Sequence, residues 1–256
     1  MPACRCGRWP AARSRRSRST TTEGGWLHIA PEALVADALE AKAKGFSGAK
    51  LKIGKPDPRE DVRRIEKVRE AVGDGFEIFT DANQAFRVDE AIRRARLLEP
   101  LDIGWLEEPI ISDDIDGHAR LSAATTLPVA VGESIYSALW FREYMQRGAC
   151  SVVQVDVARI GGITPWLKVA HTAEAFNMPV CPHFLMELHV SLCCAVPNAR
   201  WLEYIPQLDD LTAEGMAIEA GHGVPSAAPG LGIVWDRDRI AAQRVRDTVT
   251  IGKGRA

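Results

Sequence analysis

The sequence predicts an α/β fold in which parallel strands, each followed by a helix, close into a barrel. From about Gly45 onward, short apolar stretches alternate with stretches whose apolar residues recur at three- and four-residue steps. Successive strand candidates lie about 20 to 30 residues apart, which is typical of βαβ units in a parallel sheet. An open doubly wound sheet is the alternative, but it usually carries a glycine-rich loop after its first strand, and the sequence has no GxGxxG.

The strand candidates after Gly45 supply all but one of the strands that a closed barrel needs. A further strand near Trp26–Ile29 would complete the count. After Ile205 the alternation fades, and AIEAGHGVPSAAPGLGIVW predicts a turn-rich strand pair followed by a short terminal helix. Helical patterns such as DPREDVRRIEKVREAVG and ITPWLKVAHTAEAF separate the strands. In chain order the strand candidates are Ala49–Ile53, Glu77–Asn83, Ile103–Pro109, Pro128–Ser134, Ser151–Val157, Pro179–Phe184 and Trp201–Ile205.

Composition divides the chain into a short basic start and one acidic domain. Residues 1–22 hold six arginines and no acid, whereas the remainder has 26 basic and 34 acidic side chains, a net charge of −8. The Arg/Ser-rich start lacks the apolar stretch of a secretory signal, so we expect residues 1–24 to be a disordered tail. A transit peptide and an aberrant, out-of-frame start are the alternatives. Because no linker interrupts residues 25–256, we expect them to form one barrel domain.

Composition also argues against several classes of protein. The apolar share of 46% and the charged share of 26% are ordinary for a soluble globular protein. No apolar run is long enough to span a bilayer, so we expect no membrane contact. An acidic domain gives no reason to expect nucleic-acid binding. The six cysteines form no CxxC pair, which favours a reducing cytoplasm.

Three acids at the ends of consecutive strands predict a metal centre. They are Asp81 in TDANQ, Glu107 in WLEEP and Glu133 in VGES. The carboxyl ends of barrel strands meet at the end of the barrel where active sites lie. Each acid alone would more often be a solvated strand end or a helix N-cap. The three together favour Mg²⁺, which prefers oxygen ligands and needs neither Cys nor His.

Basic side chains at other strand ends predict general acid–base chemistry. Lys50 and Lys52 in AKLKIG face the same way, and their repulsion beside a divalent ion would lower a lysine pKa. That suits Lys52 as a general base. His183 in CPHF would more often be a core histidine, but Asp156 on the preceding strand offers its ring a partner. Lys52 and His183 lie on strands roughly across the barrel, so we expect them to approach opposite faces of one substrate.

These segments together resemble the enolase superfamily, and within it the mandelate racemase subgroup of the mandelate racemase/muconate lactonizing enzyme family. The resemblance runs from about Gly25 to Trp235, through GAKLKIG, TDANQ, WLEEP, VGES, VDVARIGGIT, PHFLMELH and WLEYI. It implies a TIM-like (β/α)7β barrel with one Mg²⁺ per subunit. It also implies the superfamily's known chemistry, in which a Lys or His base removes the proton next to a carboxylate and Mg²⁺ stabilises the enediolate.

The resemblance implies a role for each polar residue at a strand end. Glu107, and not its neighbour Glu108, would bind the metal, and Lys50 would neutralise charge beside the base. The implied metal ligands are Asp81, Glu107 and Glu133; the implied bases are Lys52 and His183, the latter paired with Asp156; and the implied contacts to substrate or enediolate are Asn83, Lys50 and a protonated Glu203.

The fate of the enediolate distinguishes two expected reactions. Reprotonation of the carbon gives the epimer, whereas protonation of a departing β-hydroxyl releases water and leads to a 2-keto acid. PHFLMELH and EYIPQLD resemble the acid-sugar dehydratases more than mandelate racemase, so we expect a hydro-lyase, with a racemase of 2-hydroxy acids as the alternative. We expect a small-molecule carboxylate as substrate and a homo-oligomer.

The missing capping domain is the main departure from the family pattern. Family members carry a domain before the barrel that closes the site and selects the substrate, and residues 1–23 do not resemble it. A truncated start and an inactive barrel fragment are therefore further expectations. A phosphate-binding barrel that uses Gly161–Gly162 is a weaker alternative, because the phosphate loops expected after the last two strands are missing.

Overall fold

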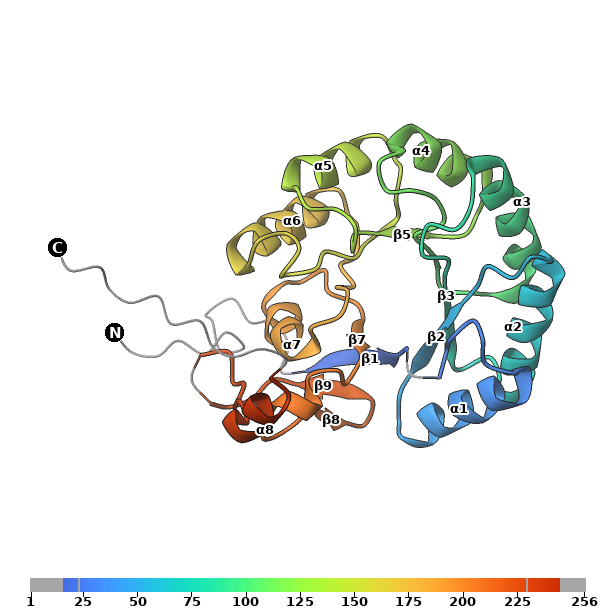
Figure 1. Ribbon diagram of the computed structural model, residues 1–256. Helices are drawn as coiled ribbons and strands as arrows, with labels where there is room; N and C mark the ends of the chain where they lie inside the picture. Colours follow the sequence, from blue (N-terminus) through green and yellow to red (C-terminus); the bar gives the residue numbers. More distant parts are fainter. Residues whose placement is uncertain (1–15, 23, 229, 245–256) are drawn as a thin grey trace.

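The structure, a computed structural model, describes residues 16–22, 24–228 and 230–244. Strands and helices alternate along the chain, and Figure 1 shows α1 to α6 around the outside of the strands. The elements are β1 (Ser17–Thr21), α1 (Pro31–Ala43), β2 (Gly48–Lys52), α2 (Pro58–Val72), β3 (Glu77–Asp81), α3 (Val88–Leu98), η2 (Glu99–Leu101), β4 (Leu106–Glu107), α4 (Ile115–Ala124), β5 (Val129–Val131), α5 (Ala138–Gln146), β6 (Val152–Val153), α6 (Ile163–Ala175), α7 (Met186–Ala195), β7 (Leu202–Tyr204), η3 (Asp209–Leu211), β8 (Ala217–Glu219), β9 (His222–Val224) and α8 (Arg237–Ala242).

The parallel strands close into a ring. Strands β1 to β6 pair in sequence order, and β7 returns to pair with β1. Between β6 and β7, Val180 pairs in parallel with Val153 on one side and with Ala199 on the other. Within the described residues the ring thus has eight strand positions, and the first seven are each followed by one of the helices α1 to α7. This arrangement confirms the predicted (β/α)7β barrel.

The first barrel strand lies earlier in the chain than the sequence analysis predicts. Strand β1 falls inside residues 1–24, where composition predicts a disordered tail, and the backbone of Trp26–Ile29 forms turns and irregular structure. Both predictions are therefore wrong for these residues. The hydrophobic pattern does not reveal β1 because its buried side chains are serines and threonines, of which Ser19 and Thr20 are almost fully buried. Residues 1–15 lie outside the described part of the chain.

Pairing on several sides explains why this polar segment is a strand. β1 lies between β2 and β7 in the barrel, and its beginning also pairs antiparallel with β9. Threonine suits a strand because its branched side chain packs well on a pleated surface. The Ser19 hydroxyl accepts a hydrogen bond from the Gly223 backbone N–H at 3.0 Å, which satisfies a buried polar group.

The C-terminal elements follow the prediction. Strands β8 and β9 form an antiparallel hairpin where the turn-rich strand pair is expected, and α8 is the short helix after it. None of the helices in the described ranges combines the length and the apolar character needed to cross a bilayer.

An aromatic layer fills the inside of the barrel. The rings of Phe79 and Trp105 stack with centroids 3.8 Å apart, and Trp201 meets Phe79 edge-on at 5.2 Å. These three residues, which we call the aromatic floor, pack with Ala130, Val152 and Cys181. Because side chains two positions apart lie on the same face of a strand, the residue two positions after each aromatic also faces the barrel interior.

A buried ion cluster holds the loop between β2 and α2. One carboxylate oxygen of Asp61 accepts hydrogen bonds from the backbone N–H of Gly54 at 2.9 Å, from that of Lys55 at 3.1 Å, and from the Arg94 guanidinium at 2.8 Å. Arg64 lies 3.5 Å from the other oxygen and donates to the backbone carbonyl of Lys52 at 3.0 Å. Asp61 therefore fixes the backbone that leaves the second barrel strand.

We predict that Asp61→Ala lowers the free energy of unfolding by about 3–5 kcal/mol, because it removes the carboxylate that faces the buried Arg64 and Arg94 guanidinium groups and leaves Arg94 only its contact with Glu90. Urea denaturation would measure the change. Glu40→Ala, which removes an exposed ion pair with Lys44, is the control and should leave stability unchanged. A similar small effect in both variants would contradict this account of the cluster.

Candidate metal centre and active site

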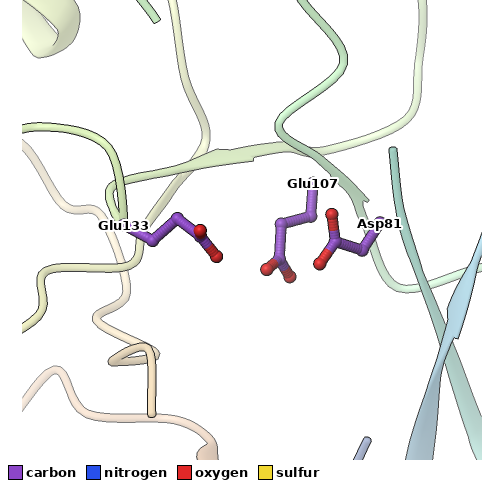
Figure 2. A group of neighbouring side chains, drawn as sticks. All are labelled: Asp81, Glu107 and Glu133. Atoms are coloured by element: carbon purple, nitrogen blue, oxygen red, sulfur yellow. The ribbon is translucent and has the colours of Figure 1, made fainter. Parts of the chain in front are cut away.

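Three carboxylates converge at the carboxyl end of the barrel (Figure 2). Asp81 ends β3, Glu107 ends β4, and Glu133 follows β5. One oxygen of each residue lies within 4.8 Å of the others. Asp81 and Glu107 are fully buried, and Glu133 is partly exposed. The structure thus brings the three predicted metal ligands together, and a set of hard oxygen donors of this kind suits Mg²⁺.

The strand geometry explains this convergence. Asp81 and Glu107 lie two positions after Phe79 and Trp105, so their side chains stand on the aromatic floor and face the barrel interior. Glu133 reaches the cluster through Gly132, whose φ is +157°. A Cβ atom there would overlap the backbone carbonyl of Gln154, so only glycine fits between the two strands.

Glu107 is anchored from below by two donors that the sequence analysis missed. Its Oε2 accepts hydrogen bonds from Trp105 Nε1 at 3.0 Å and from Gln154 Nε2 at 2.7 Å. Burial and the neighbouring charge of Asp81 raise the pKa of Glu107 to about 8, although Lys50 opposes the rise. The sequence signal for Gln154 is its place inside the apolar run VVQV, two positions before the predicted site residue Asp156.

Lys50 is a buried cation among carboxylates. Its Nζ lies 2.7 Å from Glu107 Oε1, 2.5 Å from Glu203 Oε1 and 3.4 Å from Asp81 Oδ2. Burial alone would lower its pKa, but the three carboxylates outweigh burial and hold the pKa well above its usual value. Lys50 is therefore a fixed positive charge inside the barrel, as its predicted neutralising role requires.

Lys52 lies nearer the mouth of the barrel, at the end of the same strand. Its Nζ donates hydrogen bonds to Asp81 Oδ2 and, at 2.7 Å, to Asn83 Oδ1. The backbone N–H of Asn83 donates to Asp81 Oδ1 at 2.9 Å, and the left-handed φ of +43° at Asn83 turns its side chain back toward Lys52. The structure therefore places the predicted base and the predicted substrate contact side by side.

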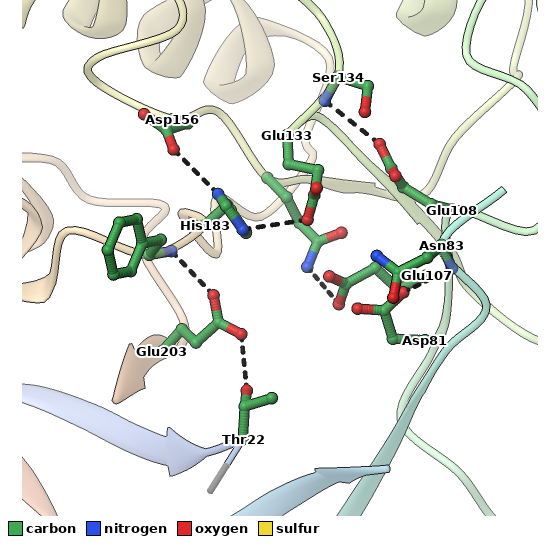
Figure 3. A network of polar contacts seen from close by, with 12 residues as sticks. Thr22, Asp81, Asn83, Glu107, Glu108, Glu133, Ser134, Asp156, His183 and Glu203 are labelled. Atoms are coloured by element: carbon green, nitrogen blue, oxygen red, sulfur yellow. Dashed lines mark hydrogen bonds and ion pairs between the residues drawn. The ribbon is translucent and has the colours of Figure 1, made fainter. Parts of the chain in front are cut away.

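His183 lies between two carboxylates (Figure 3). Its Nδ1 is 2.9 Å from Asp156 Oδ2, and its Nε2 is 3.0 Å from Glu133 Oε2. Burial opposes the charge of the ring, but the hydrogen bonds to Asp156 and Glu133 raise the pKa of His183 to about 10. Asp156 is itself held by the backbone N–H groups of Ala158 at 2.7 Å and Arg159 at 3.2 Å. The predicted Asp–His pair is thus formed.

Glu203 accepts hydrogen bonds from two neighbours in the barrel interior. It stands two positions after Trp201 of the aromatic floor and accepts hydrogen bonds from the Thr22 hydroxyl at 2.7 Å and the Phe184 backbone N–H at 2.8 Å. Burial opposes its ionisation, but the charges of Lys50 and His183 lower the pKa of Glu203 to about 2. The protonated state of Glu203 that the resemblance implies stays a prediction, and Thr22 is a contact that was missed because β1 was not recognised.

Glu108 points away from the carboxylate cluster, which supports the choice of Glu107 (Figure 3). Its two oxygens accept hydrogen bonds from the Ser134 backbone N–H at 3.2 Å and from Gln84 Nε2 at 3.1 Å. The backbone φ of +38° at Glu108 turns the chain out of the strand direction.

The two basic groups flank the carboxylate cluster at opposite ends. Lys52 contacts Asp81, at one end of the cluster, and His183 contacts Glu133, at the other. A carboxylic acid bound to an ion in the cluster would therefore lie between an amine and an imidazole. Such an arrangement can remove a proton from one face of a substrate and deliver a proton from the other.

Comparison with known proteins finds one family and a set of related enzymes. Residues 33–239 match the family model described as enolase C-terminal domain-like. The chain is 40% identical over 214 residues to L-talarate/galactarate dehydratase of Salmonella typhimurium, covering 82% of this chain and 53% of that protein. It is 39% identical over 199 residues to 3,6-anhydro-alpha-L-galactonate cycloisomerase of Streptomyces coelicolor, covering 77% and 55%.

A solved structure shows the same fold. L-talarate dehydratase from Polaromonas sp. JS666, complexed with Mg and L-glucarate, superposes with a TM-score of 0.86 at 36% identity and covers 90% of this chain and 64% of that one. The chain spans about half the length of the curated relatives that it matches.

We predict that Mg²⁺ stabilises this protein against heat and that Glu133→Gln abolishes the effect. An ion at 100 times its Kd adds about 2.7 kcal/mol to the free energy of unfolding, which raises the Tm of a chain of this size by about 5–10 °C. Thermal melts at increasing Mg²⁺ would measure the shift. Glu108→Gln, which removes a neighbouring acid outside the cluster, is the matched control and should keep the shift. Equal shifts in wild type and Glu133→Gln would contradict the predicted metal centre.

Proposed function

The chain belongs to the enolase C-terminal domain-like family, and from that premise we propose that it is the barrel domain of a Mg²⁺-dependent acid-sugar dehydratase. One observation carries the proposal: the cluster of Asp81, Glu107 and Glu133 lies between Lys52 and the Asp156–His183 pair. The similarity to L-talarate/galactarate dehydratase of Salmonella typhimurium favours a sugar acid as the substrate class.

The residues of the cluster fit Mg²⁺. Their donor atoms are all carboxylate oxygens, and one from each residue lies within 4.8 Å of the others. We propose that Asp81, Glu107 and Glu133 would hold one ion. When bound, the ion supplies positive charge that stabilises the second negative charge on a substrate carboxylate after its α-proton is removed.

Lys52 is the proposed general base. Its amine, aligned by hydrogen bonds to Asp81 and Asn83, takes the α-proton and leaves the electron pair to form the enediolate. General-base catalysis of this kind contributes about 10²–10⁴-fold. Lys50, held between Glu107 and Glu203, places a second fixed cation beside the developing charge.

His183 is the proposed general acid. Asp156 binds its Nδ1 and orients the ring, so that Nε2 faces Glu133 and the cluster. A proton from Nε2 to the departing β-hydroxyl releases water as the electron pair of the enediolate forms the double bond, and the resulting enol rearranges to a 2-keto acid. Delivery of that proton to the α-carbon instead would give the epimer, which is the racemase alternative.

We also propose the extent and setting of the domain. The barrel domain includes Ser17–Thr21, because β1 closes the ring. The buried free thiols of Cys150, Cys181, Cys193 and Cys194 fit a reducing cytoplasm. The exposed apolar side chains of Tyr136, Leu139 and Trp140 at the start of α5 favour a homo-oligomer, since such patches mark protein contacts.

We predict that the protein with Mg²⁺ converts at least one member of a panel of aldonates and aldarates to a 2-keto acid. Incubation in D2O, with NMR of the remaining substrate and a chemical assay for 2-keto acids, would measure this. Deuterium at the α-carbon without any keto acid would reject the dehydratase in favour of the racemase. Neither product with any acid would favour an inactive barrel that requires a further domain.

We predict that Lys52→Ala and His183→Asn each lower kcat by about 10²–10⁴-fold while the Mg²⁺-dependent thermal shift remains. Lys52→Ala should also abolish α-deuterium exchange, because it removes the base, whereas His183→Asn should leave some exchange. Lys55→Ala, which alters a nearby lysine paired with Glu60, is the control and should keep full activity. Exchange that survives in Lys52→Ala and disappears in His183→Asn would reverse the two assignments.

A further inference from the structure

A second histidine lies buried behind the Asp156–His183 pair. His189 is on α7, one turn from the beginning of the helix, and has no exposed surface. Its ring centroid lies 6.0 Å from that of Trp166, whose Nε1 donates to the backbone carbonyl of Val155 at 3.0 Å. His189 is therefore packed against the same strand end that carries Asp156.

The two ring nitrogens of His189 bind the two segments that carry the pair. Nε2 accepts a hydrogen bond from the backbone N–H of Val157 at 3.0 Å, and Nδ1 donates to the backbone carbonyl of Phe184 at 2.5 Å. Val157 directly follows Asp156, and Phe184 directly follows His183. One side chain thus joins the neighbour of each member of the pair.

These partners determine the protonation state of His189. The carbonyl of Phe184 can only accept, so Nδ1 carries the hydrogen, and the N–H of Val157 can only donate, so Nε2 is bare. Burial lowers the pKa of His189 to about 4, so the neutral ring persists near neutral pH. The ring is a rigid link with one donor and one acceptor.

The backbone after His183 depends on such a link. Phe184 has a φ of +52° and Leu185 of +38°, conformations that side chains with a Cβ rarely adopt and that persist where surrounding contacts impose them. The N–H of Phe184 donates to Glu203 at 2.8 Å, and its carbonyl accepts from His189. Phe184, the residue directly after His183, is therefore held at both its N–H and its carbonyl.

We propose that His189 is a positioning residue that sets the geometry of the Asp156–His183 pair by binding the backbone of Val157 and Phe184 at the same time. The role in catalysis rests on the proposed function, in which Nε2 of His183 must face the substrate. A displacement of about 1 Å at a reacting group can cost about 10²-fold in rate, so loss of this link should lower kcat.

Three substitutions of His189 distinguish its hydrogen bond with Val157 from its hydrogen bond with Phe184. His189→Phe removes both hydrogen bonds while nearly keeping the ring volume. His189→Asn keeps a donor near the place of Nδ1, and His189→Gln keeps an acceptor near the place of Nε2. His118→Phe is the matched control, because His118 is equally buried and its Nδ1 also binds a backbone carbonyl, that of Asp114 at 2.9 Å, but it lies on α4 in the helical shell.

Two measurements test the proposal. The first is kcat and KM for the sugar acid that the wild type dehydrates. We expect His189→Phe to lower kcat about 10²-fold with KM and the Mg²⁺-dependent thermal shift unchanged. The decrease in kcat should be smaller in His189→Asn and His189→Gln. His118→Phe should keep the wild-type kcat. The second is the ring ¹⁵N chemical shifts of His183 in labelled protein, assigned by their absence in His183→Asn. They should move toward those of an exposed histidine in His189→Phe, move less in His189→Asn and His189→Gln, and stay unchanged in His118→Phe.

The outcomes are distinguishable. An unchanged kcat in His189→Phe, or a loss equal to that in His118→Phe, would overturn the proposal. If His189→Phe does not fold, kcat of His189→Asn and His189→Gln is compared with kcat of His118→Phe instead, and no greater loss in the His189 variants would overturn the proposal. If the wild type acts on no sugar acid, the proposed function fails, and the ¹⁵N shifts alone decide whether His189 positions His183: unchanged shifts in the His189 variants would reject it.

Discussion

The buried ammonium group of Lys50 is the contact on which the polar interior of the barrel depends. It lies within 3.4 Å of oxygens of Asp81, Glu107 and Glu203. Burying several neighbouring carboxylates away from water is strongly unfavourable unless a buried cation balances their negative charge. Lys50 supplies that cation from a strand adjacent to both β1 and β3, so it joins the acid on β7 to the acids at the ends of β3 and β4.

The packing of the barrel interior then determines where the chemistry can occur. Phe79, Trp105 and Trp201 form an apolar layer, and strand alternation places an acid two positions above each of them. Water is excluded from below, which strengthens every charge interaction above. Trp105, which belongs to this layer, and Gln154 donate hydrogen bonds to one oxygen of Glu107 and so orient its carboxylate.

The site also couples its proton-transfer groups to its carboxylates. Lys52 shares Asp81 with Lys50, and His183 joins Glu133 to Asp156. Much of this could be predicted from sequence: the acids at strand ends, the two lysines and the Asp–His pair. The contacts of Glu203 could not, because they depend on its distances to Lys50 and Thr22, which chain spacing does not contain.

The sequence by itself determined seven barrel strands, the C-terminal hairpin and the residues of the carboxylate cluster, because each has a local signal: apolar periodicity, glycine and proline at the joins, and charged residues where strands end. Tertiary structure decided the first strand, whose serines and threonines become a strand through pairing with distant segments. It also decided the contact of Thr22 with Glu203, which are 181 positions apart, and the contact of His189 with Val157, which are 32 positions apart. Such contacts form when the ring closes, and no short stretch of chain encodes them.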